Sequence, residues 1–182
     1  MIKTNKEIKR IADRILYEFG LFDELSKIGV PHIIGSYKMD VMAANDVDID
    51  VENDKMSLEK LHELTAFILK TFNPTWYEAK QEVDDIGNTV WFHGFEFIIE
   101  DELFNVDVWF FDREAIKRAE NYYDKISSQA TDGQKNTIIA LKRELIARGL
   151  YKPDMYTSMH VYEAVLEKNV VDIERFLRLY KE

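Results

Sequence analysis

The sequence predicts an α+β fold, in which a mixed, twisted sheet has flanking helices and a helical C-terminal layer. Apolar residues recur at spacings of three and four near both ends of the chain, a pattern typical of amphipathic helices. Acidic and apolar residues alternate over 47–51, and aromatic and β-branched residues are frequent over 75–111. Both patterns indicate strands, so helices enclose a central sheet region.

The first helix is predicted from one apolar face that comprises Ile8, Ile11, Ala12, Ile15, Leu16, Phe19, Phe22 and Leu25. Thr4 and Glu7 form a plausible capping box at its start, and we expect Gly29 to end it. Pro31 then leads into a short apolar strand over 32–34.

The middle of the chain alternates between strand and helix. After a loop or short helix over 38–45, the period-two alternation of 47–51 predicts a strand. Ser57 is a candidate cap for the next helix, and Asn73 followed by proline should end it. Three more strands are expected at roughly 75–83, 90–100 and 104–111.

The C-terminal part of the chain is predicted to be helical. Its apolar spacing is interrupted near Asp132, over 149–154 and near Asn169, which marks the ends of successive helices. We therefore expect two segments, a core over 1–112 and a helical C-terminal segment over 113–182 that packs on the core.

The composition limits the classes of function. With no cysteine, the chain has no disulfides, thiolate zinc sites or cysteine nucleophiles, and it fits a reducing, cytoplasmic environment. The four histidines are scattered, so no zinc site is expected. No apolar run is long enough to span a bilayer. The formal charge of −10 would repel phosphate backbones, so we do not expect a nucleic-acid partner.

Three acidic residues on predicted strands suggest a metal site. Asp48 and Asp50 occupy positions i and i+2 of one strand, so their side chains share a face about 6.5–7 Å apart. Asp107 lies between apolar neighbours in a later strand. Carboxylates suit Mg²⁺ or Mn²⁺, and ions about 3.5–4 Å apart serve in-line phosphoryl displacement. Asp107 could complete the site or accept the proton of an attacking hydroxyl.

Gly35 and Ser36 follow the short strand over 32–34 and are candidates for binding nucleotide phosphates. Glycine lets the backbone approach a phosphate closely, and Ser36 adds a hydroxyl and an N–H. Lys38 follows them and is the third candidate nucleotide-binding residue. Further candidates in the tail are Lys135, Lys142 and Arg143.

Together these residues resemble the signature of the DNA polymerase β-like nucleotidyltransferase superfamily. Gly35 and Ser36 are followed after eleven residues by Asp48 and Asp50, and later by the strand residue Asp107. The pattern is most similar to the small bacterial branch that contains aminoglycoside, lincosamide and minimal nucleotidyltransferases. The resemblance implies a nucleotidyltransferase fold. It also implies transfer of a nucleotidyl group from a nucleoside triphosphate, with ATP expected, to a hydroxyl of a small molecule or protein, releasing pyrophosphate. Asp48, Asp50 and Asp107 would hold the divalent ions.

An alternative is a non-catalytic protein of the same fold that binds a nucleotide or a partner protein, as regulatory or antitoxin-like members do. The three acids favour the enzyme, because clustered carboxylates repel one another without a cation. Other acidic residues are expected to be solvated loop positions, namely Asp40, Asp46, Asp84 and Asp85. Aromatic residues that could border a ligand pocket are Trp109, Tyr151, Tyr156 and Tyr162, although packing is their default interpretation.

Overall fold

The computed structural model describes residues 3–53, 55–83 and 87–180. It contains one five-stranded sheet, made of β1 (Val30–Ile33), β2 (Asp46–Glu52), β3 (Trp76–Val83), β4 (Thr89–Ile99) and β5 (Glu102–Phe111). The helices are α1 (Asn5–Asp13), η1 (Arg14–Glu18), α2 (Leu21–Ser26), α3 (Gly35–Met39), α4 (Leu58–Phe72), α5 (Arg113–Gln129), α6 (Asp132–Ala147), α7 (Ser158–Leu166) and α8 (Ile173–Leu179). The predicted α+β fold with a mixed sheet is confirmed. The expected strands all form, with bounds that differ by one or two residues.

The sheet order is β1-β2-β5-β4-β3, and only the β2–β5 pair is parallel. The chain leaves β2, forms α4, β3 and β4, and returns beside β2 as β5. The parallel register places Asp48 opposite Asp107 and Asp46 opposite Asn105. Residues from distant parts of the sequence are thereby neighbours at the centre of the sheet.

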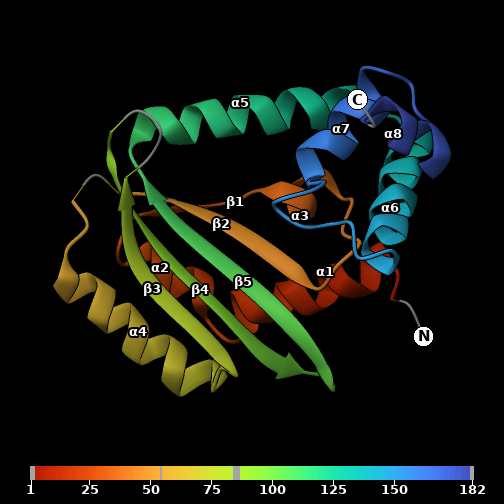
Figure 1. Ribbon diagram of the computed structural model, residues 1–182. Helices are drawn as coiled ribbons and strands as arrows, with labels where there is room; N and C mark the ends of the chain where they lie inside the picture. The colour runs from red at the N-terminus through yellow and green to blue at the C-terminus, as the bar shows by residue number, and fades with distance from the viewer. Residues whose placement is uncertain (1–2, 54, 84–86, 181–182) are drawn as a thin grey trace.

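One face of the sheet is apolar and forms the main core. Alternate residues of β2, β4 and β5 point to this face, because side chains of a strand alternate between the two sides. Together with residues from α1, η1, α2 and α4 they form one cluster of buried side chains. Figure 1 shows α1 and α2 behind the strands and α4 along the β3 side. The opposite face of β2 and β5 is left for polar side chains.

The N-terminal helical region departs from the single helix that the sequence predicts. Its capping box forms as expected, with the Thr4 side chain and Glu7 satisfying each other's backbone N–H groups. After α1, however, the chain forms the π-helical segment η1, and Gly20 adopts a left-handed conformation with φ +77° before α2 begins. Glycine has no Cβ, so it adopts this conformation readily and the helix axis can change there. The apolar side chains still face the core.

The C-terminal helices form a second apolar cluster. It contains buried residues of α5 to α8 together with Met39 and Val41, which lie at and after the end of α3. Figure 1 shows α5 running across one end of the sheet, with α6, α7 and α8 gathered beside it. No helix among the described residues is long and apolar enough to cross a membrane. The helical segment is thus anchored to the sheet region through the short helix α3.

Candidate active site

Four aspartates project from the polar face of β2 and β5, and three of them line one cavity. Asp46, Asp48 and Asp50 share this face because the apolar residues between them point to the core. The cavity has a volume of about 540 Å³, and Asp46, Asp48 and Asp107 line it, whereas Asp50 is not among its lining residues. The structure therefore brings together two of the three predicted metal ligands and adds Asp46, which the sequence analysis had assigned to a solvated loop.

The backbone of Gly35 lies against the carboxylate of Asp48. A Cβ atom on Gly35 would lie 2.3 Å from Oδ2 of Asp48, and the φ angle of Gly35 is +61°. Both observations favour glycine at this position, since a side chain would displace the Asp48 carboxylate and strain the backbone. The N-terminus of α3 is thereby held at the wall of the cavity.

The electrostatic environment disfavours the charged forms of the cavity acids. Burial, followed by the charges of Asp46 and Asp107, raises the pKa of Asp48 to about 7. Burial also raises the pKa of Asp46, while the ammonium group of Lys142 opposes that increase. For Asp107, burial is again the main cause of a raised pKa. Three carboxylates that resist ionisation in this way would be relieved by a bound cation.

Asp50 has a different environment from the cavity acids. Its side chain is only 5% exposed, and burial raises its pKa to about 7, with His32 acting in the opposite direction. His32 is directly opposite Asp50 on β1, and its Nδ1 lies 2.8 Å from a carboxylate oxygen of Glu120 on α5. Asp50 therefore lies where β1, β2 and α5 pack together, rather than at the open cavity.

The three residues predicted to bind nucleotide are also separated. Gly35 lines the main cavity. Ser36 is 4% exposed and borders a small neighbouring space with Lys142 and Asp46. The ammonium group of Lys38 is 2.8 Å from Asp124 and does not line the main cavity. The nucleotide-binding roles of Gly35, Ser36 and Lys38 stay predictions.

The helical segment forms the other wall of the cavity. The wall contains Tyr123, Tyr151, Tyr156 and Tyr162, and Trp109 borders the same space from β5. The N-terminus of α7 contributes Thr157, Ser158 and Met159, and Lys152 lies nearby. Backbone N–H groups at a helix N-terminus favour an anion, so this wall suits a phosphate. The tyrosines singled out from the sequence do line a pocket.

Lys142 lies buried beside the cavity acids. Its side chain is 2% exposed, and its ammonium group donates a hydrogen bond of 2.9 Å to the hydroxyl of Tyr162. Its attraction opposes the raised pKa values of Asp46 and Asp48. A buried positive charge at this point partly compensates the acids.

The donor set fits a hard divalent ion. Carboxylate oxygens on adjacent strands are ligands that Mg²⁺ and Mn²⁺ accept. Within the described residues, no three acidic or histidine side chains are drawn together around one point in the manner of a finished metal site. Electrostatic repulsion keeps these carboxylates apart, and a bound cation would allow them to approach one another.

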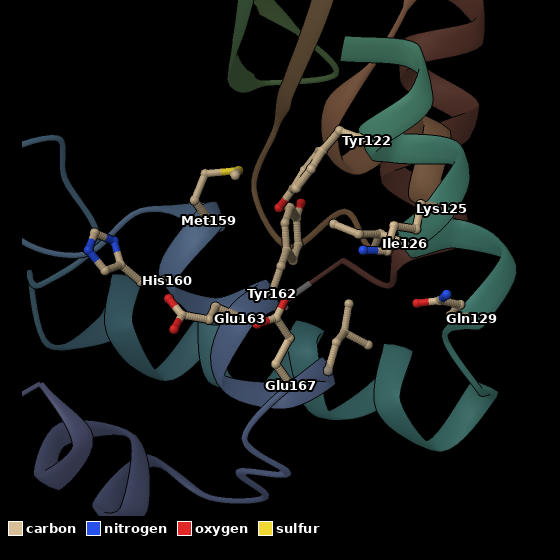
Figure 2. A pocket seen from close by; sticks show the side chains of 10 residues that line it. Tyr122, Lys125, Ile126, Gln129, Met159, His160, Tyr162, Glu163 and Glu167 are labelled. Atoms are coloured by element: carbon tan, nitrogen blue, oxygen red, sulfur yellow. The ribbon is translucent and has the colours of Figure 1, made fainter. Parts of the chain in front are cut away.

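A second cavity of about 650 Å³ lies between α5 and α7 (Figure 2). Tyr122 and Lys125 come from α5, Glu163 comes from α7, and Glu167 is the C-cap residue of α7. Met159 and Tyr162 line both this cavity and the one that contains the acids. These two side chains therefore form the partition between the two spaces.

Comparison with solved structures shows a nucleotidyltransferase fold. The chain is similar to a cytoplasmic RNA terminal U-transferase, with a TM-score of 0.61 and 15% identity over 91% of this chain and 49% of that one. The poly(U) polymerase Cid1, solved with Mg and 3′-dATP, gives a TM-score of 0.62 and 16% identity over 90% and 49%. GLD-2 from a complex with RNP-8 gives 0.52 and 12% over 87% and 49%. The chain thus spans about half the length of these relatives.

No protein-family model matches the chain, and no curated protein sequence matches it significantly. The predicted nucleotidyltransferase fold is confirmed, whereas membership of the polymerase β-like superfamily and of its small bacterial branch stays a prediction. The expectation that nucleic acid is not a partner gains no support, since the similar structures include an RNA terminal U-transferase and a poly(U) polymerase.

Proposed function

We propose that this protein is a metal-dependent nucleotidyltransferase, which transfers a nucleotidyl group from a nucleoside triphosphate to a hydroxyl and releases pyrophosphate. The observation that supports this most strongly is the register of β2 with β5. It pairs Asp48 with Asp107, and both line one cavity with Asp46 and the backbone of Gly35. Clustered carboxylates repel one another, so an acidic cavity at the centre of a nucleotidyltransferase fold favours bound cations.

In this proposal Asp46, Asp48 and Asp107 are the metal ligands. Asp50 supports them from the packed interface of β1, β2 and α5, which revises the initial assignment of Asp50 as a ligand. Mg²⁺ or Mn²⁺, when bound, supplies positive charge that neutralises the phosphates. The triphosphate in this proposal is ATP, and the location is the cytoplasm.

The triphosphate would bind between the acids and the N-terminus of α7. Gly35 gives the phosphates access to the backbone of α3, and Ser158 and Met159, at the N-terminus of α7, line the same cavity. Lys152 is a cation at the cavity wall. The buried ammonium group of Lys142 partly compensates the negative charge of the cavity acids.

The acceptor hydroxyl would attack the α-phosphorus from the side of Asp107. A bond forms from the hydroxyl oxygen to phosphorus as the bond to the pyrophosphate oxygen breaks, and the carboxylate of Asp107 accepts the proton. The acceptor is a small molecule or a protein hydroxyl in this proposal. RNA is retained as a competing acceptor because of the structural relatives.

Thermal unfolding with and without millimolar Mg²⁺ and each of the four ribonucleoside triphosphates tests binding. At a ligand concentration of 100 times Kd, the expected stabilisation is about 2.7 kcal/mol. Pyrophosphate release, with water or added alcohols as acceptor, tests turnover. Stabilisation without pyrophosphate release would favour the non-catalytic alternative, and no stabilisation by any triphosphate with Mg²⁺ or Mn²⁺ would reject the proposal.

A further inference from the structure

The second cavity, between α5 and α7, takes no part in the proposed nucleotidyl transfer. Its volume of about 650 Å³ is within the range of sites for small molecules. None of the aspartates of the acidic cavity lines it, and Met159 and Tyr162 separate the two spaces. A molecule bound between α5 and α7 would therefore occupy a different place from the triphosphate.

The wall that α5 contributes to this cavity offers hydrogen-bond donors and a positive charge. Lys125 and Gln129 are one turn apart on α5, and Figure 2 shows both on the α5 side of the cavity. In the part of the chain that the structure describes, the Lys125 ammonium group has no ion pair. An ammonium group beside an amide favours a carboxylate or another anionic oxygen.

The wall that α7 contributes is negatively charged. Glu163 lies in the last turn of α7, Glu167 is the C-cap residue, and this turn contains no basic residue. The carbonyl groups at a helix C-terminus carry partial negative charge, which the two carboxylates increase. Glu163 has the ammonium group of Lys168 at 3.9 Å, whereas Glu167 has no ion pair among the described residues. This wall therefore favours a positively charged group.

The charges of the two walls do not neutralise each other. Lys125 forms no ion pair with Glu163 or Glu167, although all three side chains line the same cavity. Ile126 from α5 and Leu166 from α7 add apolar surface to the two walls. The cavity thus combines a positive wall, a negative wall and apolar side chains, which together match a small zwitterion with an apolar part.

We propose that this cavity binds an α-amino acid with an apolar side chain. The carboxylate of the amino acid accepts hydrogen bonds from Lys125 and Gln129, and its ammonium group pairs with Glu167. Its side chain packs against Ile126 and Leu166. The site does not depend on the proposed function, because no proposed metal ligand lines it.

Isothermal titration of the whole protein with three related probes tests this assignment. L-Phenylalanine carries both charged groups, phenethylamine lacks the carboxylate, and 3-phenylpropanoate lacks the ammonium group. Phenylalanine should bind at least about fivefold more tightly than either analogue, because each analogue loses one charge-assisted contact. Phenylalanine should also bind when Mg²⁺ and a nonhydrolysable ATP analogue are saturating, since the two ligands occupy different cavities.

Two variants assign each charged group of the probe to one wall. In Lys125→Gln, phenylalanine and phenethylamine should bind with Kd values within about twofold of each other. In Glu163→Gln/Glu167→Gln, the same should hold for phenylalanine and 3-phenylpropanoate. Lys117→Gln is the matched control, because Lys117 also lies on α5 but lines neither cavity; it should change the Kd of phenylalanine by less than about twofold. An unchanged midpoint of thermal unfolding shows that each variant is folded.

Four results would overturn the amino-acid site. They are no binding of phenylalanine at millimolar concentration, phenethylamine binding as tightly as phenylalanine, displacement of phenylalanine by the ATP analogue, and Kd values in the variants that equal those of the control. Failure of the ATP analogue to bind counts against the proposed function alone, because the titrations with the three probes do not require it.

Discussion

Asp46, Asp48 and Asp50 project from the same side of β2, yet their side chains face different surroundings. Asp46 and Asp48 line the cavity with Asp107. Asp50 is 5% exposed at the junction of β1 and α5, opposite His32. Residue type and strand position alone thus do not decide which acid can reach a metal ion. The decisive factor is which elements cover each end of β2.

The first prediction compares these acids by isosteric substitution. Asp46→Asn or Asp48→Asn should lower the rate of pyrophosphate release by about 10²-fold or more, because each removes a charged ligand where charge develops. Asp50→Asn should lower the rate by less than about tenfold, since Asp50 lies outside the cavity. The exposed Asp40→Asn serves as a control. A larger loss for Asp50→Asn than for Asp46→Asn would reverse the assignment.

Part of this site is predictable from the sequence. The period-two pattern places three aspartates of β2 on one face, and the apolar neighbours of Asp107 predict a second acidic strand. The choice between Asp46 and Asp50 is not predictable from that pattern, because it depends on where α5 and β1 cover the sheet. Asp46 lies two residues before Asp48, so in a strand its side chain would lie on the same face. This spacing was the sequence feature that could have identified Asp46 as a third acid of the site. The side chain of Lys38 is likewise directed to Asp124 by the packing of α3 against α5.

His93 provides a pH-dependent test of the core. Its side chain is fully buried, Nδ1 lies 2.9 Å from the Tyr77 hydroxyl, and Nε2 has no hydrogen-bond partner among the described residues. From α4, Thr65 contacts the same tyrosine hydroxyl. Burial lowers the pKa of His93 to about 4. The unfolded chain therefore takes up a proton near pH 6.5 that the folded protein does not accept until about pH 4, and stability falls as the pH decreases through this window.

The second prediction concerns this loss of stability as the pH decreases. Relative to His93→Asn, which retains an acceptor near Nδ1, the free energy of unfolding of the unaltered protein should fall by about 2 kcal/mol between pH 6.5 and pH 5. Urea unfolding at several pH values measures the difference between the two proteins and cancels the contribution of the aspartates, whose raised pKa values act in the opposite direction. Parallel pH profiles of the two proteins would show that folding does not lower the pKa of His93.

At the scale of elements, α6 and α7 are joined by the buried pair Lys142 and Tyr162. The pair connects two helices and also stands behind the cavity acids, since Tyr162 lines the cavity. A buried ammonium group that loses its acceptor keeps the cost of desolvation without the compensating bond.

The third prediction is that Tyr162→Phe destabilises the protein by roughly 1–3 kcal/mol. Lys142→Met in the same background should restore part of that stability, because it removes the unpaired charge. Urea midpoints of the single and double variants form the cycle. Additive effects of the two substitutions would show that the hydrogen bond does not link the helices.

Local signals account for most element boundaries. The capping boxes at Thr4 and Thr131 and the cap at Ser57 mark helix starts, and the left-handed Asn73 ends α4. The break at Gly20 was not predicted, because the apolar positions continue with helical spacing on both sides of it and a glycine can also lie inside a helix. Asp84 and Asp85, expected to be solvated, lie outside the described residues.

At the scale of the whole molecule, the cavity lies between the sheet and the helical segment. The strands supply the acids, while α5, α7 and the connection before α7 supply the tyrosines and the helix N-terminus. The predicted division into 1–112 and 113–182 follows a change in composition, and we retain it as a proposal, with the site requiring both parts. The sequence alone does not predict that the two segments share a cavity, since this depends on how α5 and α7 pack against β2.

The most direct test of the proposed metal site is a crystal structure with Mn²⁺ and a nonhydrolysable triphosphate, with ions located by anomalous scattering. We predict Mn²⁺ at about 2.0–2.2 Å from carboxylate oxygens of Asp46, Asp48 and Asp107, with phosphate oxygens completing the coordination. Asp50 should remain buried beside His32 without a metal contact. Mn²⁺ coordinated by Asp50 instead of Asp46, or a triphosphate bound away from these acids, would contradict the proposed site.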